Sequence, residues 1–153
     1  NKDILIFDAG CDTGLVGLEL KKYGFKHFHG VDLSQTLLDS VPNNLYQKLT
    51  KNDLNKKIEA KDNSYDAVMC VGTFTFGHVK PNALDEFVRI TKAGGLICFT
   101  INEGIHEEYG FDKKITSLKE NNKWKELEFF KSDYIASKDV NAWLGLYEVT
   151  KNV

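Results

Sequence analysis

Short apolar runs alternate with amphipathic stretches along this chain, a rhythm that predicts strand–helix–strand units and a parallel sheet. Residues 4–7 are strand formers and predict a buried first strand, which runs into a glycine-bearing turn. Residues 15–20 then have the length and flanks of a helix, and Gly24 is expected to end it after two lysines. Residues 28–32 predict a second strand that finishes on an acid.

The rest of the chain continues the same alternation. Further strands are predicted over residues 45–49, 65–71, 96–101, 127–134 and 143–149, and further helices over residues 34–40, 82–91 and 111–121. Ser34 and Asp112 are the expected N-caps. The Gly94-Gly95 pair is expected to end one helix and release the next strand. Residues 51–64 are too hydrophilic for a core and predict a surface connection, whereas the last two strands predict an antiparallel pair that closes the sheet.

Length and composition narrow the class of protein. The chain has 153 residues, of which 42% are hydrophobic and 27% charged, as in an ordinary globular protein with one core. The formal net charge is -2 and no long basic run is present, which disfavours nucleic acid and anionic membranes as partners. No apolar run approaches the roughly 20 residues that span a bilayer. We therefore expect one domain without a membrane segment.

The three cysteines, Cys11, Cys70 and Cys98, are widely spaced, and each sits in or beside an apolar segment. This placement favours buried free thiols over a disulfide framework. The cysteines and histidines do not have the spacing of a metal site, so no metal is expected. A reducing, cytoplasmic setting follows from this use of cysteine.

The turn from Asp8 to Gly14 carries the candidate chemistry. A strand that leads through such a turn into a helix presents backbone N–H groups and a positive helix end to an anionic ligand group. Gly10 and Gly14 would permit tight turning and close approach of a ligand to the backbone. Asp32 ends the next predicted strand, close to the spacing of about 20 residues at which a carboxylate accepts hydrogen bonds from ribose hydroxyls.

Several segments together resemble a known family. Residues 7–17 resemble the first motif of class I S-adenosylmethionine-dependent methyltransferases, an acid followed by a G-x-G-x-G turn. Residues 29–34, 52–54, 64–72 and 92–96 are similar to the acid motif of the second strand, the adenine segment, the fourth strand and the K-P-G-G turn of that family. A narrower resemblance, to the methyltransferase-like proteins of the Williams-Beuren syndrome region, is carried by residues 14–17, 29–32, 45–47 and 71–74.

The resemblance implies a doubly wound α/β fold, with a mostly parallel, seven-stranded, Rossmann-like sheet and an antiparallel C-terminal strand. It implies S-adenosylmethionine as cofactor and S-adenosylhomocysteine as product, with the Asp53 side chain at the adenine amino group. The cofactor-binding residues that it implies are Asp8, Gly10, Cys11, Asp12, Gly14, Asp32, Leu33, Asp53, Leu54 and Val71. Methyltransferases of this kind usually carry helices before the first strand, so residues 1–153 are expected to be a single domain that lacks them.

Two positions depart from the family pattern. Asp12 replaces the middle glycine of the turn, and it adds a carboxylate beside the expected methionine end of the cofactor. That charge would repel the methionine carboxylate and attract the amino group or the sulfonium. Aspartate tolerates left-handed backbone better than most residues, so the turn is expected to survive. Ala93 replaces the proline of the K-P-G-G turn, a change expected to be nearly harmless.

The expected activity is transfer of a methyl group to N, O, S or C of an acceptor, with a small molecule favoured and a protein left open. Cys11 and Cys70 are interpreted as packing residues, and His78 is the candidate general base, with a loop-bracing role as its alternative. A catalytically weak, cofactor-binding interaction module is the second hypothesis, and Asp12 is its main support. A nicotinamide dehydrogenase is disfavoured because the G-x-G-x-x-G pattern is absent. The sequence makes no prediction of oligomeric state.

Overall fold

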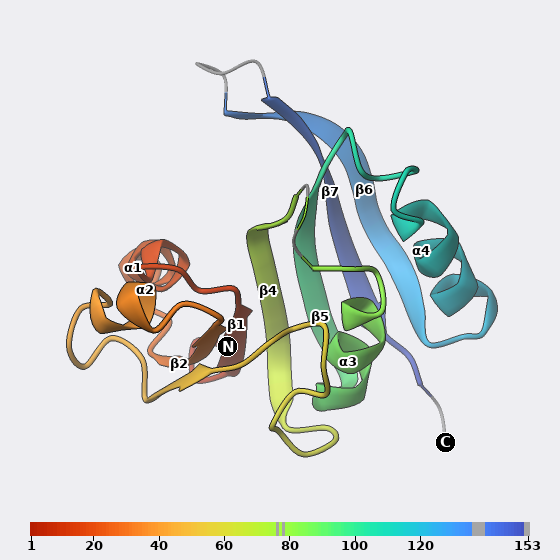
Figure 1. Ribbon diagram of the computed structural model, residues 1–153. Coiled ribbons are helices and arrows are strands. Elements are labelled where there is room, and N and C mark those ends of the chain that lie inside the picture. Colours follow the sequence, from red (N-terminus) through yellow and green to blue (C-terminus); the bar gives the residue numbers. More distant parts are fainter. Residues whose placement is uncertain (76, 78, 136–139, 152–153) are drawn as a thin grey trace.

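The computed structural model describes residues 1–75, 77, 79–135 and 140–151, and in this part of the chain seven strands form one sheet with helices on both faces (Figure 1). The strands are β1 (Leu5–Ala9), β2 (His27–Asp32), β3 (Lys48–Lys51), β4 (Tyr65–Phe74), β5 (Thr91–Asn102), β6 (Trp124–Ile135) and β7 (Val140–Val149). The helices are α1 (Leu15–Lys22), α2 (Gln35–Asp39), α3 (Ala83–Ile90) and α4 (Phe111–Glu120). The expected elements are therefore present in the expected order.

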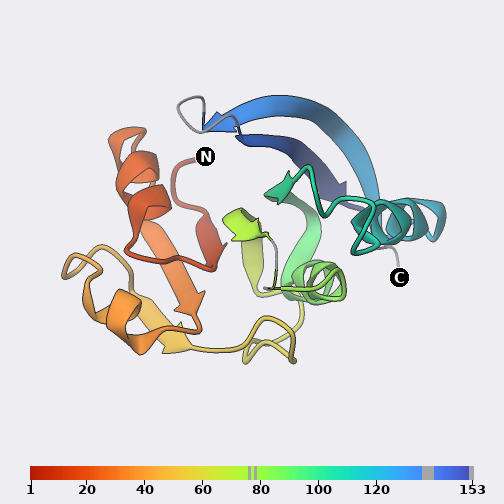
Figure 2. The same ribbon diagram turned by 45° about the horizontal axis from the view of Figure 1, so that its top comes forward.

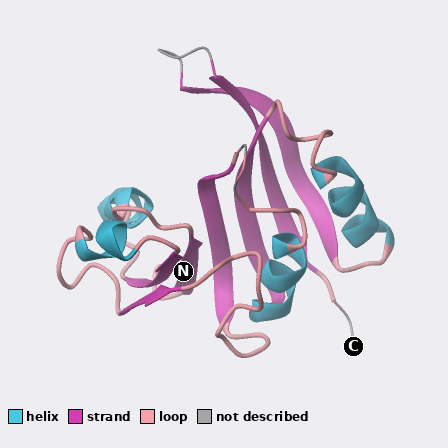
Figure 3. Cartoon of the chain, in the orientation of Figure 1, coloured by secondary structure: helices cyan, strands magenta, loops and turns pink. Residues whose placement is uncertain are grey.

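The strand order is β3-β2-β1-β4-β5-β7-β6. Strands β1 to β5 pair in parallel, β7 pairs antiparallel with β5, and β6 pairs antiparallel with β7 (Figure 3). This confirms the doubly wound, mostly parallel sheet of seven strands with an antiparallel C-terminal strand. The order reverses between β1 and β4, which is the point where open α/β sheets bind ligands at the carboxyl ends of their strands.

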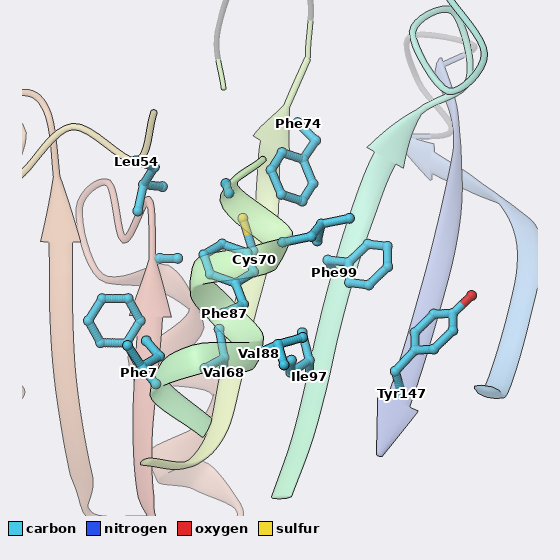
Figure 4. Close-up of a cluster of buried hydrophobic side chains, with 14 of the residues drawn as sticks. Phe7, Leu54, Val68, Cys70, Phe74, Phe87, Val88, Ile97, Phe99 and Tyr147 are labelled. Atoms are coloured by element: carbon cyan, nitrogen blue, oxygen red, sulfur yellow. The ribbon is translucent and has the colours of Figure 1, made fainter. Parts of the chain in front are cut away.

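Helices α1 and α2 lie on one face of the sheet, and α3 and α4 lie on the other (Figure 2). Each face has its own apolar cluster, because successive side chains of a strand point to opposite sides. On β1, Ile6 joins the cluster with Phe28 and Leu38, whereas Phe7 joins the larger cluster with Phe87 (Figure 4). No helix in the described part of the chain is long and apolar enough to cross a membrane.

The polar segment between β3 and β4 differs from expectation, because it contributes to the core. Leu54 and Ile58 are 5% and 1% exposed and belong to the larger cluster. Arg89 of α3 stabilises this segment by donating hydrogen bonds of 2.8 Å to the carbonyl oxygens of Ile58 and Ala60. Two isolated apolar residues in a hydrophilic stretch do not form a periodic pattern, so the sequence prediction of a surface connection was wrong for them.

Several element boundaries also differ from the prediction: β4 ends three residues later, and β6 and β7 each begin three residues earlier. Strand β3 begins at Lys48, three residues later than predicted, because Leu45 and Tyr46 are buried in the loop before it. Strand β5 begins at Thr91, so the Gly94-Gly95 pair lies inside an irregular part of the strand instead of ahead of it. Helix α4 has Gly110 as its N-cap, without a side-chain hydrogen bond, and Asp112 lies in its first turn. The Ser34 cap is confirmed, since its hydroxyl accepts a hydrogen bond of 3.3 Å from the Leu37 N–H.

Candidate functional site

A cavity of about 540 Å³ opens at the carboxyl ends of β1, β2, β3 and β4, beside the start of α1. Its volume is in the range of small-molecule and cofactor sites, roughly 300–1,000 Å³. The residues that line it are Gly10, Cys11, Asp12, Leu15, Val16, Asp32, Leu33, Leu37, Asn52, Asp53, Leu54, Asn55, Val71, Gly72, Thr73, Thr75, Gly77 and Val79. The loops that follow four neighbouring parallel strands therefore line one cavity.

The turn between β1 and α1 forms one side of the cavity. Its backbone takes the left-handed conformation at Gly10, Asp12 and Gly14, with φ values of 73°, 54° and 91°. The N–H groups of Gly10 and Cys11 both donate hydrogen bonds of 2.9 Å to the Val31 carbonyl, which ties the turn to β2. Because aspartate is among the residues that adopt this conformation readily, Asp12 is compatible with the turn.

Asp32, the last residue of β2, joins the turn to the next loop. Its Oδ2 accepts a hydrogen bond of 2.9 Å from the Asp12 N–H, and its Oδ1 accepts one of 3.0 Å from the Ser34 N–H. A carboxylate has about four lone-pair sites, so each oxygen retains capacity for a further hydrogen bond. The two backbone donors hold this carboxylate at the cavity wall, where it is able to accept hydrogen bonds from two neighbouring hydroxyl groups.

The glycines of the turn have roles that the sequence did not distinguish. A Cβ atom at Gly10 would lie only 2.1 Å from the Thr73 Oγ1, so this glycine lets β4 approach the turn closely. A Cβ atom at Gly14 would lie 3.2 Å from the Val41 Cγ1, on the packed side of the turn. Gly14 is therefore the N-cap of α1 and a packing position, and it is not among the residues that line the cavity.

Asp8 also lies away from the cavity lining. Its side chain is 2% exposed, and its Oδ2 accepts a hydrogen bond of 2.5 Å from the Tyr46 hydroxyl. The Tyr46 oxygen in turn accepts a hydrogen bond of 3.2 Å from the Gly17 N–H in α1. Burial, and to a lesser degree the charge of Asp32, raises the pKa of Asp8 to about 6 from an ordinary value of 3.8.

Tyr46 fits against the backbone of two elements that glycines leave open. A Cβ atom at Gly17 of α1 would lie 2.7 Å from its ring, and one at Gly30 of β2 would lie 2.9 Å from it. The hydroxyl thus reaches Asp8 from a position between the helix and the sheet. Tyr46 was not among the predicted site residues, because the partners in this contact are up to 38 residues apart. No local pattern links them.

The loop after β3 forms the opposite side of the cavity. The Asn52 N–H donates a hydrogen bond of 3.1 Å to the Asp32 carbonyl, which holds this loop beside β2. The Asp53 Oδ1 accepts a hydrogen bond of 2.9 Å from the Asn55 N–H. The Asn52 Nδ2 is buried and has no hydrogen-bond partner among the described residues. A buried donor without a partner is rare, and on a cavity wall it favours a polar ligand.

Eight of the ten predicted cofactor-binding residues line this one cavity, and Asp8 and Gly14 are the two that do not.

Burial raises the pKa of the Cys11 thiol to about 12 and also raises the pKa of the Cys70 thiol. Both thiols are therefore protonated at neutral pH, which agrees with their interpretation as packing residues. His78 lies outside the described residues. The described part of the chain holds no group of three or more potential ligands positioned to bind a metal ion.

Comparison with known proteins gives a consistent result. A family model described as a methyltransferase domain matches residues 7–99. Methyltransferase-like protein 27 of Homo sapiens is 41% identical over 98 residues, which are 63% of this chain and 40% of that protein. The chain thus spans 40% of the length of this relative.

Two solved structures have the same fold. An S-adenosylmethionine-dependent methyltransferase from Mesorhizobium loti has a TM-score of 0.75 at 12% identity, over 95% of this chain and 91% of that one. A putative S-adenosylmethionine-dependent methyltransferase from Listeria monocytogenes has a TM-score of 0.77 at 12% identity, over 98% and 92% of the two chains. At this level of identity, the likeness concerns the fold alone.

Proposed function

The chain belongs to the family of class I S-adenosylmethionine-dependent methyltransferases, and we propose that its cavity binds this cofactor for methyl transfer to a small-molecule acceptor. The observation that carries the proposal is the convergence on one cavity of the glycine turn, Asp32 and the Asn52–Asn55 loop. Because one seven-stranded sheet contains all the strands described, we also propose that residues 1–153 form one domain.

Three features of the cavity fit an adenosyl amino-acid ligand. The carboxylate of Asp32 has free acceptor capacity for the ribose hydroxyls, which are hydrogen-bond donors. The unpartnered Asn52 Nδ2 offers a buried donor on the wall where the nucleoside would lie. Leu33, Leu37 and Leu54 supply the apolar surface on which a purine ring packs.

In the proposed complex, each side of the cavity holds a different part of the cofactor. Asp32 would orient the ribose, and Asp53 would accept a hydrogen bond from the adenine amino group. The first turn of α1 presents its N-terminal N–H groups to the methionine carboxylate, because Leu15 and Val16 lie at the cavity. The backbone ties of the turn to Val31 keep these groups in place before the ligand arrives.

When bound, S-adenosylmethionine supplies an activated methyl group, whose carbon forms a bond to the acceptor atom as its bond to sulfur breaks. The contribution of the protein is then to position the acceptor and to exclude water. Thr75 follows the carboxyl end of β4 on the cavity wall, where its hydroxyl would orient an acceptor, whereas the Thr73 hydroxyl donates a hydrogen bond of 3.4 Å to the Ala9 carbonyl. The charged residues described on this wall are acids, which disfavours polyanionic acceptors such as nucleic acid.

Titration calorimetry with S-adenosylmethionine and S-adenosylhomocysteine, followed by turnover on a panel of small-molecule acceptors, tests this proposal. We expect both nucleosides to bind at one site per chain and a subset of acceptors to be methylated. Absence of binding by either nucleoside would contradict the proposal. Binding without turnover would favour the second hypothesis, a catalytically weak interaction module, for which the Asp12 substitution is the supporting observation.

A further inference from the structure

The wall of the cavity has an uncompensated negative charge. Asp12, Asp32 and Asp53 line it, and the described lining residues include no lysine, arginine or histidine. None of the three aspartates forms an ion pair within the part of the chain that the structure describes. These carboxylates favour a ligand with more positive charge over a neutral one of the same shape.

Asp12 is the residue that makes this chain more negative than the family pattern, which has a glycine in its place. Its side chain is exposed at the cavity, and its backbone N–H is fixed on the Asp32 carboxylate at 2.9 Å. Asp12 and Asp32 are therefore neighbours in space, although they belong to different loops. In the proposed complex, C5′ would lie between the ribose at Asp32 and the methionine carboxylate at the start of α1, and Asp12 belongs to the turn that joins these two parts of the cavity.

The atom attached to C5′ is the one whose charge changes in the reaction. In S-adenosylmethionine it is a positively charged sulfonium, whereas in S-adenosylhomocysteine it is an uncharged thioether. The two molecules are otherwise alike, and each also has one ammonium and one carboxylate group. The cofactor therefore has one more positive charge than the product, and that charge is on the atom attached to C5′.

On the basis of the proposed function, we propose that Asp12 makes this site selective for the cationic cofactor over its neutral product. The substitution that departs from the family pattern thereby has a role in the reaction cycle: it weakens retention of S-adenosylhomocysteine relative to S-adenosylmethionine. One unit charge about 4 Å from the sulfonium, in a cavity open to water, changes the ratio of the two affinities by about three- to tenfold. Because the cavity is open to solvent, added salt reduces this ratio.

The test is titration calorimetry of the wild-type chain and of Asp12→Asn and Asp12→Gly with three ligands. Asparagine and glycine both adopt the left-handed backbone found at position 12, so both variants are expected to keep the turn. The ligands are S-adenosylmethionine, S-adenosylhomocysteine and sinefungin, which has an amine cation in place of the sulfonium and no transferable methyl group. Asp53→Asn is the matched control, because it removes a charge from the same wall at the adenine side.

We expect the wild-type chain to bind S-adenosylmethionine and sinefungin more tightly than S-adenosylhomocysteine. Both Asp12 variants should reduce that preference by about three- to tenfold, mainly by lowering the affinity for S-adenosylmethionine and sinefungin. Asp53→Asn should lower the affinity for all three ligands and leave the ratios between these affinities unchanged.

An unchanged ratio in both Asp12 variants, or an equal change in Asp53→Asn, would overturn the role of Asp12 and leave the proposed function intact. Failure of the wild-type chain to bind any of the three ligands would overturn the proposed function and, with it, the selectivity.

Discussion

Asp8 and Asp12 belong to the same turn and have opposite surroundings. Asp12 is exposed on the cavity wall together with Asp32 and Asp53, a set that we call the wall. Asp8 is buried beneath the turn with Tyr46 and Gly17, a set that we call the floor. The wall is placed to meet a ligand, whereas the floor holds the turn and α1 in position. One acid of the motif thus faces the cavity and the other is buried in the protein, and we propose that they serve binding and architecture separately.

The largest effect on stability is expected at the floor. Tyr46→Ala removes a buried ring from between Gly17 and Gly30, and it leaves the Asp8 carboxylate without its only hydrogen-bond donor among the described residues. We expect the free energy of unfolding to fall by about 3–5 kcal/mol, as for other large-to-small changes in cores. Urea unfolding monitored by circular dichroism measures this loss. Leu49→Ala, at a position 37% exposed, is the control; an equal loss there would show that the floor has no special role.

The next effect is a dependence of stability on pH that comes from Asp8. Its pKa is raised from 3.8 to about 6 by burial, so the folded state binds the proton more tightly than the unfolded state. Between pH 4 and pH 6, the free energy of unfolding should therefore fall as pH rises, by up to about 3 kcal/mol from this group.

Asp8→Asn should remove this contribution. The unfolding free energy of the variant minus that of the wild type should thus rise across pH 4 to 6 and stay constant above pH 6. Urea titrations at each pH measure it, and the exposed Asp3→Asn serves as the control that keeps the two curves parallel. Parallel curves for Asp8→Asn itself would refute the assignment of the raised pKa.

The smallest effect is expected beside the wall. Ser34→Ala removes the hydroxyl that caps the short helix α2, while the Ser34 N–H still donates to Asp32. The expected loss of stability is about 0.5–1 kcal/mol, the usual contribution of an N-cap. Cofactor affinity should change little, because the backbone donor to Asp32 remains. A loss of affinity as large as that of a wall variant would mean that the α2 cap, and not the wall alone, organises the binding site.

The order of elements was predictable because the alternation of apolar runs and amphipathic stretches reflects the two-sided burial of the sheet. The misplaced boundary of β3 has a physical cause: Leu45 and Tyr46 pack under α1 from a loop, and an apolar run in a loop has the same pattern as a strand. Leu54 and Ile58 were missed for the converse reason, since they are buried from within a polar stretch. Tertiary packing, not local pattern, decides both cases.

The wall was predictable and the floor was not. Wall residues follow the carboxyl ends of strands; the spacing from the turn predicted Asp32, the family resemblance implied Asp53, and both line one cavity. The contact between Tyr46 and Asp8 depends on how α1 lies over the sheet, and no motif records it. The family resemblance therefore implied that Asp8 binds the ligand, whereas in the structure its carboxylate accepts a hydrogen bond from Tyr46 inside the protein.

The central claim is that Asp32 holds the cofactor at the carboxyl ends of the strands, and a thermal-shift measurement tests it most directly. At S-adenosylmethionine concentrations of about 100 times Kd, the wild-type chain should gain about 5 °C or more in Tm. Asp32→Ala should abolish this gain, while Asp39→Asn, an exposed acid of α2, should keep it. The gain is compared within each variant, because loss of two backbone hydrogen bonds lowers the Tm of Asp32→Ala without ligand. A ligand-induced gain in Asp32→Ala equal to that of the wild type would contradict the account.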